Sequence, residues 1–237
     1  RRRGWRGGVA TAAALAGLLA SLACGLVRDS EFHPTPTPVM GNALVNPGFE
    51  NGSGPWISRS AGAPEPIVVA GGAAHAGTQS LLLAIDPSSS PDAVAGVDQL
   101  ATTAEFPEFV SGYYFVEQWG DRDSQPYFEF VVAPQGPEPP VPALRFVLSG
   151  LAHEPAEHPD TVVVMVSRDE PRMGRWTYFS YPVREAFLQR AGQLPHGWWG
   201  MALRLELRYE GAAAPGARVY FDDLYMGPQA GNPNRPD

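Results

Sequence analysis

The stretch from residue 201 to residue 209 constrains the fold more than any other part of the sequence. It reads Met-Ala-Leu-Arg-Leu-Glu-Leu-Arg-Tyr, so large apolar side chains occupy the odd-numbered positions, and small or charged ones occupy the even-numbered positions. Successive side chains of a β-strand point to opposite faces of its sheet. The pattern therefore predicts a strand with one face in a hydrophobic core and the other face in water.

Seven further segments are rich in β-branched and aromatic residues and are bounded by Gly, Pro, Asp or Ser, as strands are. They are residues 80–85, 109–118, 127–132, 143–148, 161–166, 175–181 and 218–226. One short helix is expected after Pro182, because apolar residues follow at helical spacing until Gly192. Many strands, one short helix and no alternation of strands with helices predict an all-β fold, an antiparallel β-sandwich.

The composition is that of a globular protein, with 44% apolar and 18% charged residues in a chain of 237. The formal net charge is −8, and without residues 1–23 it is −12, because 13 basic residues then face 25 acidic ones. Phosphate backbones repel such a chain, which argues against a nucleic-acid partner. Every basic residue is Arg, so the chain has no lysine nucleophile or Schiff-base residue.

The N-terminus has the features of an export signal. Basic residues precede an uncharged run rich in Ala and Leu that ends at Cys24, the only cysteine. The run closes with Leu-Leu-Ala-Ser-Leu-Ala-Cys, which resembles the lipobox of bacterial lipoproteins, where the cysteine becomes diacylated after cleavage. The resemblance implies an exported protein that a lipid on Cys24 attaches to the cell membrane or cell surface.

Two alternatives to the lipid anchor stay open, namely a plain signal peptide that is cut elsewhere and an uncleaved anchor helix. We expect the signal peptide at residues 1–24 and an extended Pro- and Thr-rich linker at residues 25–41. A single domain then spans residues 42–228, and a disordered polar tail follows at residues 229–237.

Four segments, in this order, carry a family resemblance. They are NALVNPGFENGSGPW from residue 42, HAGTQSLLL from residue 75, GRWTYFSYPVREAF from residue 174 and GARVYFDDLYM from residue 216. Together they resemble the jelly-roll carbohydrate-binding modules of the galactose-binding-like superfamily, the kind found in bacterial xylanases and cellulases. The resemblance implies a jelly roll in which the first and last segments are neighbours and Phe49 fills the core.

The same resemblance implies a structural Ca²⁺ bound by Glu50, Asp222 and Asp223. Three carboxylates brought together repel one another unless a cation bridges them, and calcium prefers such oxygen ligands. Strand alternation predicts that Asp222 points inward and Asp223 outward. The alternative is that these acids cap turns and accept hydrogen bonds from the backbone.

Sugar binding needs exposed aromatic rings beside polar side chains, because the C–H face of a sugar stacks on a ring while its hydroxyls form hydrogen bonds. Two places combine such residues. Tyr113, Gln118, Trp119 and Asp121 lie in YYFVEQWGDRD, and a pair of tryptophans, Trp198 and Trp199, lies between glycines. These six are the predicted ligand-binding residues, although Trp and Tyr are more often core residues.

The sequence thus predicts a non-catalytic, lipid-anchored, carbohydrate-binding protein with a structural calcium and a polysaccharide or glycan as its partner. One alternative is a structural or adhesion β-sandwich module without a sugar site. The other is a glycoside hydrolase acting through Asp121, Asp123 or Glu129, which would need two of these carboxyl groups roughly 5–9 Å apart across a cleft.

Overall fold

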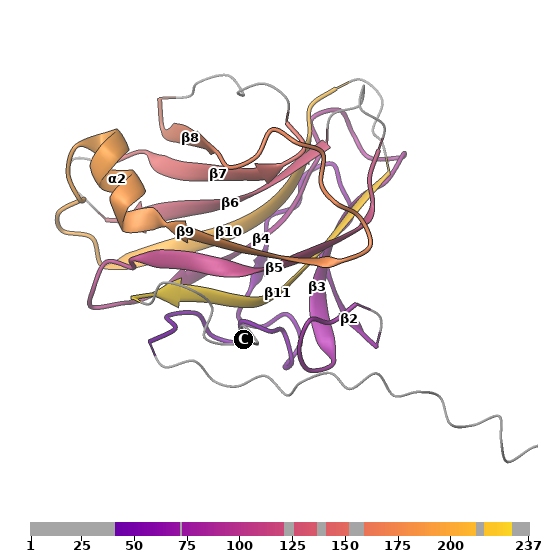
Figure 1. Ribbon diagram of the computed structural model, residues 1–237, viewed down its shortest axis with the longest axis horizontal. Helices are drawn as coiled ribbons and strands as arrows, with labels where there is room; N and C mark the ends of the chain where they lie inside the picture. The colour runs from indigo at the N-terminus through magenta and orange to yellow at the C-terminus, as the bar shows by residue number, and fades with distance from the viewer. Residues whose placement is uncertain are drawn as a thin grey trace, which may run out of the picture. The chain divides into compact units, whose positions relative to one another are not determined.

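A computed structural model describes residues 41–71, 73–120, 126–136, 141–151, 159–211 and 216–228, all within one compact unit. Two stacked β-sheets form this unit (Figure 1). The six-stranded sheet has the order β1 (Ile57–Ser58), β4 (Val94–Ala101), β10 (Gly200–Tyr209), β6 (Pro126–Gln135), β7 (Ala143–Ser149) and β8 (Thr161–Met165). The five-stranded sheet has the order β2 (Ile67–Ala70), β3 (Gln79–Ile85), β11 (Ala217–Gly227), β5 (Phe109–Gln118) and β9 (Trp176–Pro182).

The predicted fold class is confirmed. All eight predicted strands are present, and neighbouring strands are antiparallel except for the parallel pair of β7 and β8. The predicted helix is α2 (Val183–Ala191), which follows β9 directly and ends at Gly192, where φ is +76°. Figure 1 shows α2 at one end of the sandwich. No helix among the described residues has the length and hydropathy needed to cross a bilayer.

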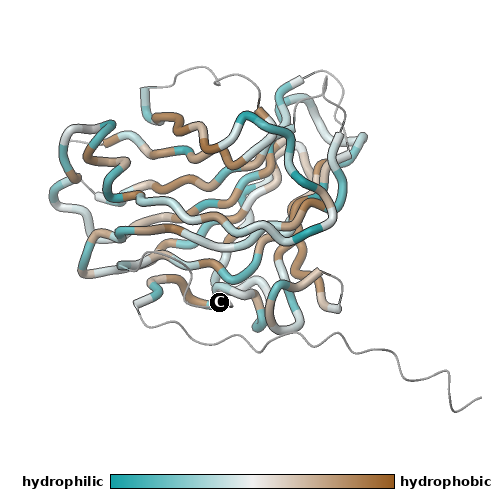
Figure 2. The backbone as a smooth tube through the Cα atoms, viewed as in Figure 1, coloured by the Kyte–Doolittle hydropathy of each residue, from teal (hydrophilic) through white to brown (hydrophobic). Residues whose placement is uncertain are grey.

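The core lies between the sheets and follows the predicted alternation of β10. Leu203, Leu205 and Leu207 have no exposed surface, and they belong to one cluster with Val219 and Phe221 of the opposite sheet. Figure 2 shows hydrophobic and hydrophilic positions alternating along several strands. Burying a side chain of this size stabilises the fold by about 1.5–3 kcal/mol, so this stripe is a main source of stability.

The outer face of β10 is buried or half-buried, although the sequence predicts that this face lies in water. Ala202 and Glu206 are buried there, and Arg204 and Arg208 are half-buried. The reason is that charged side chains from the neighbouring strands cover one another. Alternation tells which side of a sheet a residue occupies, but it does not tell what else lies on that side.

The opening segment closes the domain without forming a strand. The Nδ2 of Asn42 donates to the carbonyl of Leu224 (2.9 Å), and its Oδ1 accepts from the amide of Met226 (3.0 Å). Phe49 is fully buried against Trp56, with ring centroids 5.4 Å apart. The predicted neighbourhood of the first and last segments and the predicted burial of Phe49 are both confirmed.

The prediction that Asp222 points inward is wrong because Val219 and Phe221 fill the core, which puts Asp222 on the outer side, and a bulge after Asp222 returns Leu224 to the core. Asp222 pairs with Tyr113 and Tyr225 pairs with Ser111, so β11 has one residue more than β5 over this interval. Asp223 takes up the extra residue with φ of +48°, a left-handed conformation that Asp tolerates better than most residues. Asp222 therefore points outward, away from the core that lies between the sheets.

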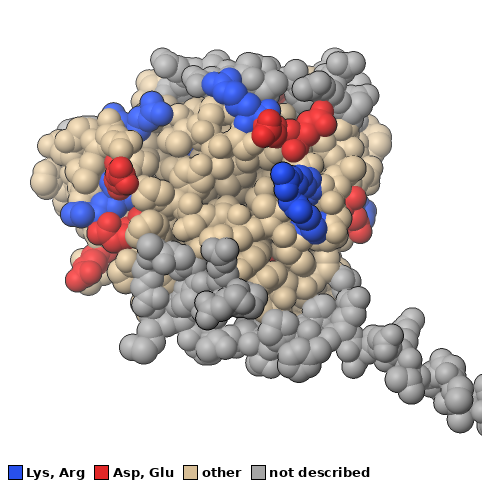
Figure 3. All heavy atoms as spheres, in the orientation of Figure 1, with Lys and Arg blue, Asp and Glu red and all other residues tan. Residues whose placement is uncertain are grey.

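The outer face of the five-stranded sheet has few charges at its centre. Figure 3 shows the side of the molecule on which β9, β5 and β11 lie nearest the viewer in Figure 1, and the charged atoms drawn there lie toward the edges. The outer face of the six-stranded sheet is the opposite case, because charged side chains from four strands meet on it.

Candidate functional site

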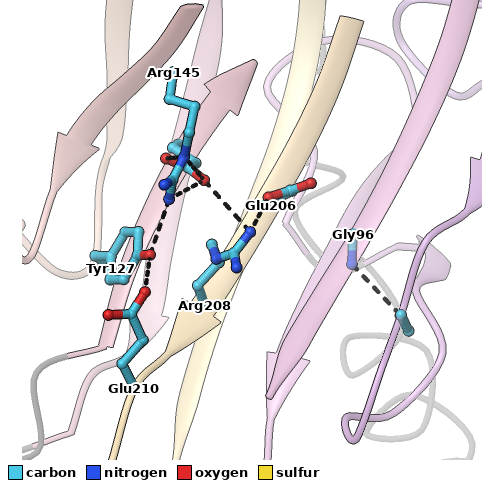
Figure 4. A network of polar contacts seen from close by, with 8 residues as sticks. Gly96, Tyr127, Arg145, Glu206, Arg208 and Glu210 are labelled. Atoms are coloured by element: carbon cyan, nitrogen blue, oxygen red, sulfur yellow. Dashed lines mark hydrogen bonds and ion pairs between the residues drawn. The ribbon is translucent and has the colours of Figure 1, made fainter. Parts of the chain in front are cut away.

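A group of paired charges covers the outer face of the six-stranded sheet, and we call it the charged face. The even-numbered residues of β10 point to this side because the odd-numbered ones fill the core. Strands β4, β6 and β7 contribute the partners (Figure 4). The charged face consists of Arg59, Asp98, Tyr127, Glu129, Arg145, Arg204, Glu206, Arg208 and Glu210.

Glu129 and Arg145 form the most buried pair of the charged face. The Nε of Arg145 lies 3.1 Å from both carboxylate oxygens of Glu129, and its Nη2 lies 2.9 Å from Oε1. The same Nη2 donates to the Tyr127 hydroxyl (3.0 Å), which in turn donates to Oε1 of Glu210 (2.6 Å), as Figure 4 shows. A two-pronged contact of this kind fixes the orientation of both side chains.

Burial raises the pKa of Glu129 to about 7. The positive charge of Arg145 acts in the opposite direction, and the negative charge of Glu206 adds to the rise. Burial has this effect because the low polarity of the surroundings disfavours the charged form of a carboxyl group. Glu129 therefore titrates close to neutral pH.

The other half of the charged face has buried polar atoms without partners. Arg59 Nη2 contacts Asp98 Oδ2 (2.7 Å), and Arg208 Nη1 contacts Glu206 Oε2 (2.8 Å). Among the described residues, five buried side-chain atoms lack a hydrogen-bond partner, and three of them lie on this face, namely Asp98 Oδ1, Arg204 Nε and Arg208 Nε. Arg204 and Asp98 are direct cross-strand partners. The unused acceptor of Asp98 and the unused donor of Arg204 therefore lie on neighbouring positions of β4 and β10, and the unused donor of Arg208 lies four residues farther along β10.

With all of its acids ionised, the charged face has no net charge. Four guanidinium groups, from Arg59, Arg145, Arg204 and Arg208, lie with four carboxyl groups, from Asp98, Glu129, Glu206 and Glu210. Leaving a buried donor or acceptor unpaired costs roughly 1–3 kcal/mol. A ligand would pair with these atoms only after the side chains that cover them move, and hydroxyl groups, which both donate and accept, would then satisfy donors and acceptors alike.

The predicted ligand-binding residues are not brought to one surface. Trp119 is half-buried and packs edge-on against Phe128 near the start of β6, with ring centroids 5.7 Å apart. The amide of Trp199 donates to the carbonyl of Gln135 (3.1 Å) at the end of the same strand. Seven residues separate these two positions, which is roughly 23 Å along a strand. Trp119 and the tryptophan pair therefore lie at opposite ends of the sandwich.

Trp199 directly precedes β10, five residues or roughly 17 Å along the strand from Arg204 of the charged face. Its side chain is 55% exposed and rests against Gly136, where β6 ends and β10 begins. Trp198 is half-buried against Phe106, with ring centroids 5.5 Å apart. Tyr113 and Gln118 belong to the other sheet, and Asp121 and Asp123 lie outside the described residues.

A partial signal for the residues that were not predicted is present in the sequence. Arg204, Glu206 and Arg208 were visible as the polar side of β10 and were interpreted as a solvated face. Glu129 stands alone among aromatic and aliphatic residues in PYFEFVV, which is an unusual place for a charge. A lone acid in such a strand indicates a buried partner of opposite charge, and that partner is Arg145.

The three predicted calcium ligands all bind one segment, residues 75–79. Asp222 Oδ2 accepts from the amides of His75 (2.7 Å) and Ala76 (3.2 Å). Glu50 Oε1 accepts from the amides of Thr78 and Gln79, both at 2.9 Å. The contacts are those of the alternative interpretation, in which the acids accept hydrogen bonds from the backbone.

The carboxylate oxygens of Glu50, Asp222 and Asp223 leave limited room for a cation. Asp223 Oδ2 lies 2.6 Å from His75 Nδ1, and each oxygen of Glu50 and Asp222 already accepts at least one hydrogen bond. Within the described ranges there is no group of three or more His, Cys, Asp or Glu side chains that could hold a metal ion. A cation bound here would use the remaining lone pairs of Glu50 and Asp222, so calcium binding stays a prediction.

Comparison with known proteins gives the fold its context. No protein-family model matches the chain, and no curated protein matches it. Among solved structures, one from work on the promiscuous specificity of carbohydrate-binding modules of the β-sandwich superfamily has a TM-score of 0.51 at 10% identity, and the match covers 79% of this chain and 63% of that chain.

Two further solved structures are similar at lower scores. TmCBM61, solved with β-1,4-galactotriose, has a TM-score of 0.48 at 14% identity over 79% of this chain and 99% of that one. The CBM22-1 xylan-binding domain of Paenibacillus barcinonensis Xyn10C has a TM-score of 0.41 at 15% identity over 84% of this chain and 100% of that one. The chain described above has the jelly-roll β-sandwich fold of carbohydrate-binding modules.

Proposed function

We propose that this protein is a non-catalytic carbohydrate-binding protein whose ligand lies on the charged face of the six-stranded sheet. The observation that carries the proposal is the group of three buried polar atoms without partners, Asp98 Oδ1, Arg204 Nε and Arg208 Nε. They lie among paired charges that sum to zero. The similarity in fold to carbohydrate-binding modules supports the same class of ligand.

The chemistry of the charged face suits a neutral glycan. Sugar hydroxyls both donate and accept, so a sugar ring can exchange hydrogen bonds with the half-buried side chains of Arg204 and Arg208 and with the carboxyl groups beside them. A glycan chain that extends from Arg204 to the start of β10 would meet Trp199, whose 55% exposed ring can stack on the apolar side of a sugar. An acidic glycan would gain less, because Arg59, Arg145 and Arg208 each already pair with a carboxylate.

Binding is tested with the full chain against a panel of soluble polysaccharides, including xylan, mixed-linked β-glucan and galactan, by affinity electrophoresis and calorimetry. We expect Arg204→Ala and Trp199→Ala each to weaken binding of the best ligand at least tenfold. Arg190→Ala, an exposed position on α2, is the matched control and should bind like the wild type. Equal affinities of Arg204→Ala, Trp199→Ala and the wild type would move the site elsewhere, and no retention on any glycan would favour the structural or adhesion module.

We further propose that the protein is exported and held at the cell membrane or cell surface by a lipid on Cys24. The sequence around this cysteine supports the proposal. Metabolic labelling with a fatty-acid analogue should mark the wild type and leave Cys24→Ser unmarked. Labelling of neither protein would favour one of the other two interpretations of the N-terminal run, and labelling of both would place the lipid at a residue other than Cys24.

We also propose a structural calcium at Glu50, Asp222 and Asp223. Burial first, and then the neighbouring charge of Asp223, raises the pKa of Asp222 to about 8, which is the effect expected of a carboxyl group that lacks a nearby cation. The melting temperature should fall when a chelator replaces calcium, since a ligand at a hundred times its Kd adds about 2.7 kcal/mol. An unchanged melting temperature would leave the three acids as hydrogen-bond acceptors for residues 75–79.

A further inference from the structure

Six rings form a continuous array on the outer face of the five-stranded sheet, and we call it the aromatic face. Successive ring centroids lie 5.2, 3.5, 5.7, 5.6 and 6.0 Å apart. In this order the rings belong to Tyr178, Tyr113, His75, Trp176, Phe115 and Tyr220. The residues come from β9, β5, β11 and the segment before β3, so the array is built by the fold and not by one stretch of sequence.

Four rings of the aromatic face are half-buried and keep part of their surface exposed, namely His75, Phe115, Trp176 and Tyr178. Phe115 and Trp176 are direct cross-strand partners at the edge where β5 meets β9. Few charged atoms lie at the centre of this side of the molecule (Figure 3). A contiguous, half-exposed aromatic surface on a soluble protein marks a binding site more often than single exposed rings do.

The rings of the aromatic face are held in place by the residues beneath and beside them. His75 stacks on Tyr113 at 3.5 Å, with 15° between the ring planes, and its Nδ1 contacts Asp223 Oδ2 at 2.6 Å. Trp176 meets the edge of His75 at 5.7 Å. Rings that are already ordered lose little conformational entropy when a ligand binds, which favours recognition.

Polar groups at one end of the aromatic face supply hydrogen bonds without net charge. The Tyr220 hydroxyl donates to Glu117 Oε2 (3.2 Å), and Arg218 Nη1 lies 3.4 Å from the same oxygen. Glu117 and Arg218 are 46% and 42% exposed, and the exposed Gln118 follows on the same strand. The edge therefore carries a carboxylate, a guanidinium and an amide that a ligand can reach.

This combination indicates the chemistry of the ligand. An apolar platform beside neutral, mixed hydrogen-bonding groups matches the C–H face and the hydroxyls of a sugar chain. An anionic lipid surface would instead need a predominantly basic rim. The charges visible around this side are of both signs (Figure 3).

We infer that the aromatic face is a second glycan-binding site, on the sheet opposite the charged face, with Trp176 and Phe115 as its platform and Glu117 as a hydrogen-bonding residue. The inference rests on the proposed function for the class of ligand and not for the place where it binds. Two sites on opposite sheets allow one molecule to hold two glycan chains at once. Linked sites of this kind raise the overall avidity well above the affinity of either site alone.

The test uses the full chain and the polysaccharide, with an oligosaccharide of it, that bind best in the panel above. Calorimetry with the oligosaccharide should give two sites per molecule for the wild type and one site for Trp176→Ala. The wild type should also cross-link the polysaccharide into a turbid suspension, and Trp176→Ala should lose this activity. Glu117→Gln, at an exposed position, tests the face without removing a ring, and we expect it to weaken the second site several-fold.

Leu188→Ala, another exposed position on α2, is the control and should keep both sites. One site in the wild type, unchanged in Trp176→Ala, would overturn the inference and leave the charged face as the proposed site. Binding lost in Trp176→Ala but kept in Arg204→Ala would support the inference and remove the proposed site on the charged face. A change of sedimentation coefficient between the wild type and Trp176→Ala without glycan would assign the aromatic face to a second copy of the chain and overturn the inference.

Discussion

Glu129 shows how a single buried carboxyl group connects the charged face to the stability of the protein. Its ordinary pKa is 4.5, and burial raises this value to about 7 in the folded protein. Between these two pH values the folded protein keeps a proton that the unfolded chain has lost. The free energy of unfolding attributable to Glu129 therefore falls as the pH rises from about 4.5 to about 7, and above that range the loss is complete.

Glu129→Gln should flatten this part of the pH profile, because glutamine does not titrate. The slope that is removed has an upper limit of about 1.4 kcal/mol per pH unit. Urea unfolding at pH 4.5, 6 and 7.5 measures it, with the exposed Glu105→Gln as the control that should keep the wild-type slope. The same slope in Glu129→Gln and in the wild type would assign the titration to Asp222, whose pKa is raised in the same direction.

At the scale of residues, the sequence predicts which face of a strand a side chain occupies better than it predicts the partners of that side chain. The buried stripe of Leu203, Leu205 and Leu207 follows from alternation alone. The unpaired atoms of Arg204 and Asp98 depend on two strands that are about 100 residues apart in the chain, so no local pattern contains them. Asp223 is a special case. Asp accepts a positive φ better than most residue types do, so its presence inside a strand is a local signal for the bulge.

At the scale of elements, β4 is the longest of the three described strands that sequence patterns missed, and the other two are β1 and β2. Strand β4 contains Gly96 and Asp98, two residue types that are depleted in strands. Both serve the neighbouring strand β10. A Cβ at Gly96 would lie 2.9 Å from the carbonyl oxygen of Leu205 and 3.2 Å from Cγ of Glu206, so only glycine leaves room for this close approach. The tertiary contact outweighs the local preference, and a single sequence does not reveal it.

Gly96→Ala should therefore destabilise the protein by about 1–3 kcal/mol, the usual range for forcing extra atoms into a packed site. Chemical unfolding measures the change. Leu100→Ala is the matched control, because Leu100 lies on the same strand and is 49% exposed, and it should change the free energy of unfolding by less than about 0.5 kcal/mol. Equal stability of the two variants would show that β4 packs less tightly on β10 than the distances at Gly96 indicate.

At the scale of the whole molecule, the opening segment is part of the core although it belongs to no sheet. Phe49 and Trp56 are both buried, and removing a large aromatic side chain from a core costs about 3–5 kcal/mol. Two such losses approach the whole free energy of unfolding of a typical domain, about 5–15 kcal/mol. The segment that resembled a family motif therefore serves structure, as its hydrogen bonds to β11 also indicate.

A chain that starts at residue 57 should consequently show no cooperative unfolding transition. A chain that spans residues 42–228 should unfold cooperatively at the same temperature as the full chain. Thermal melts followed by near-ultraviolet circular dichroism distinguish the two. A cooperative melt of the shorter chain would show that the two sheets alone carry the fold.

The meeting of the first and last segments makes the domain nearly a closed ring. A Cβ on Gly41 would lie 3.3 Å from Cδ of Pro228, so the two ends of the described chain touch. A linker of a few residues could join them, and new ends could then be opened in a surface turn, which gives a circular permutant. For the same reason the domain can be inserted into a loop of another protein without separating the two ends of the cut loop.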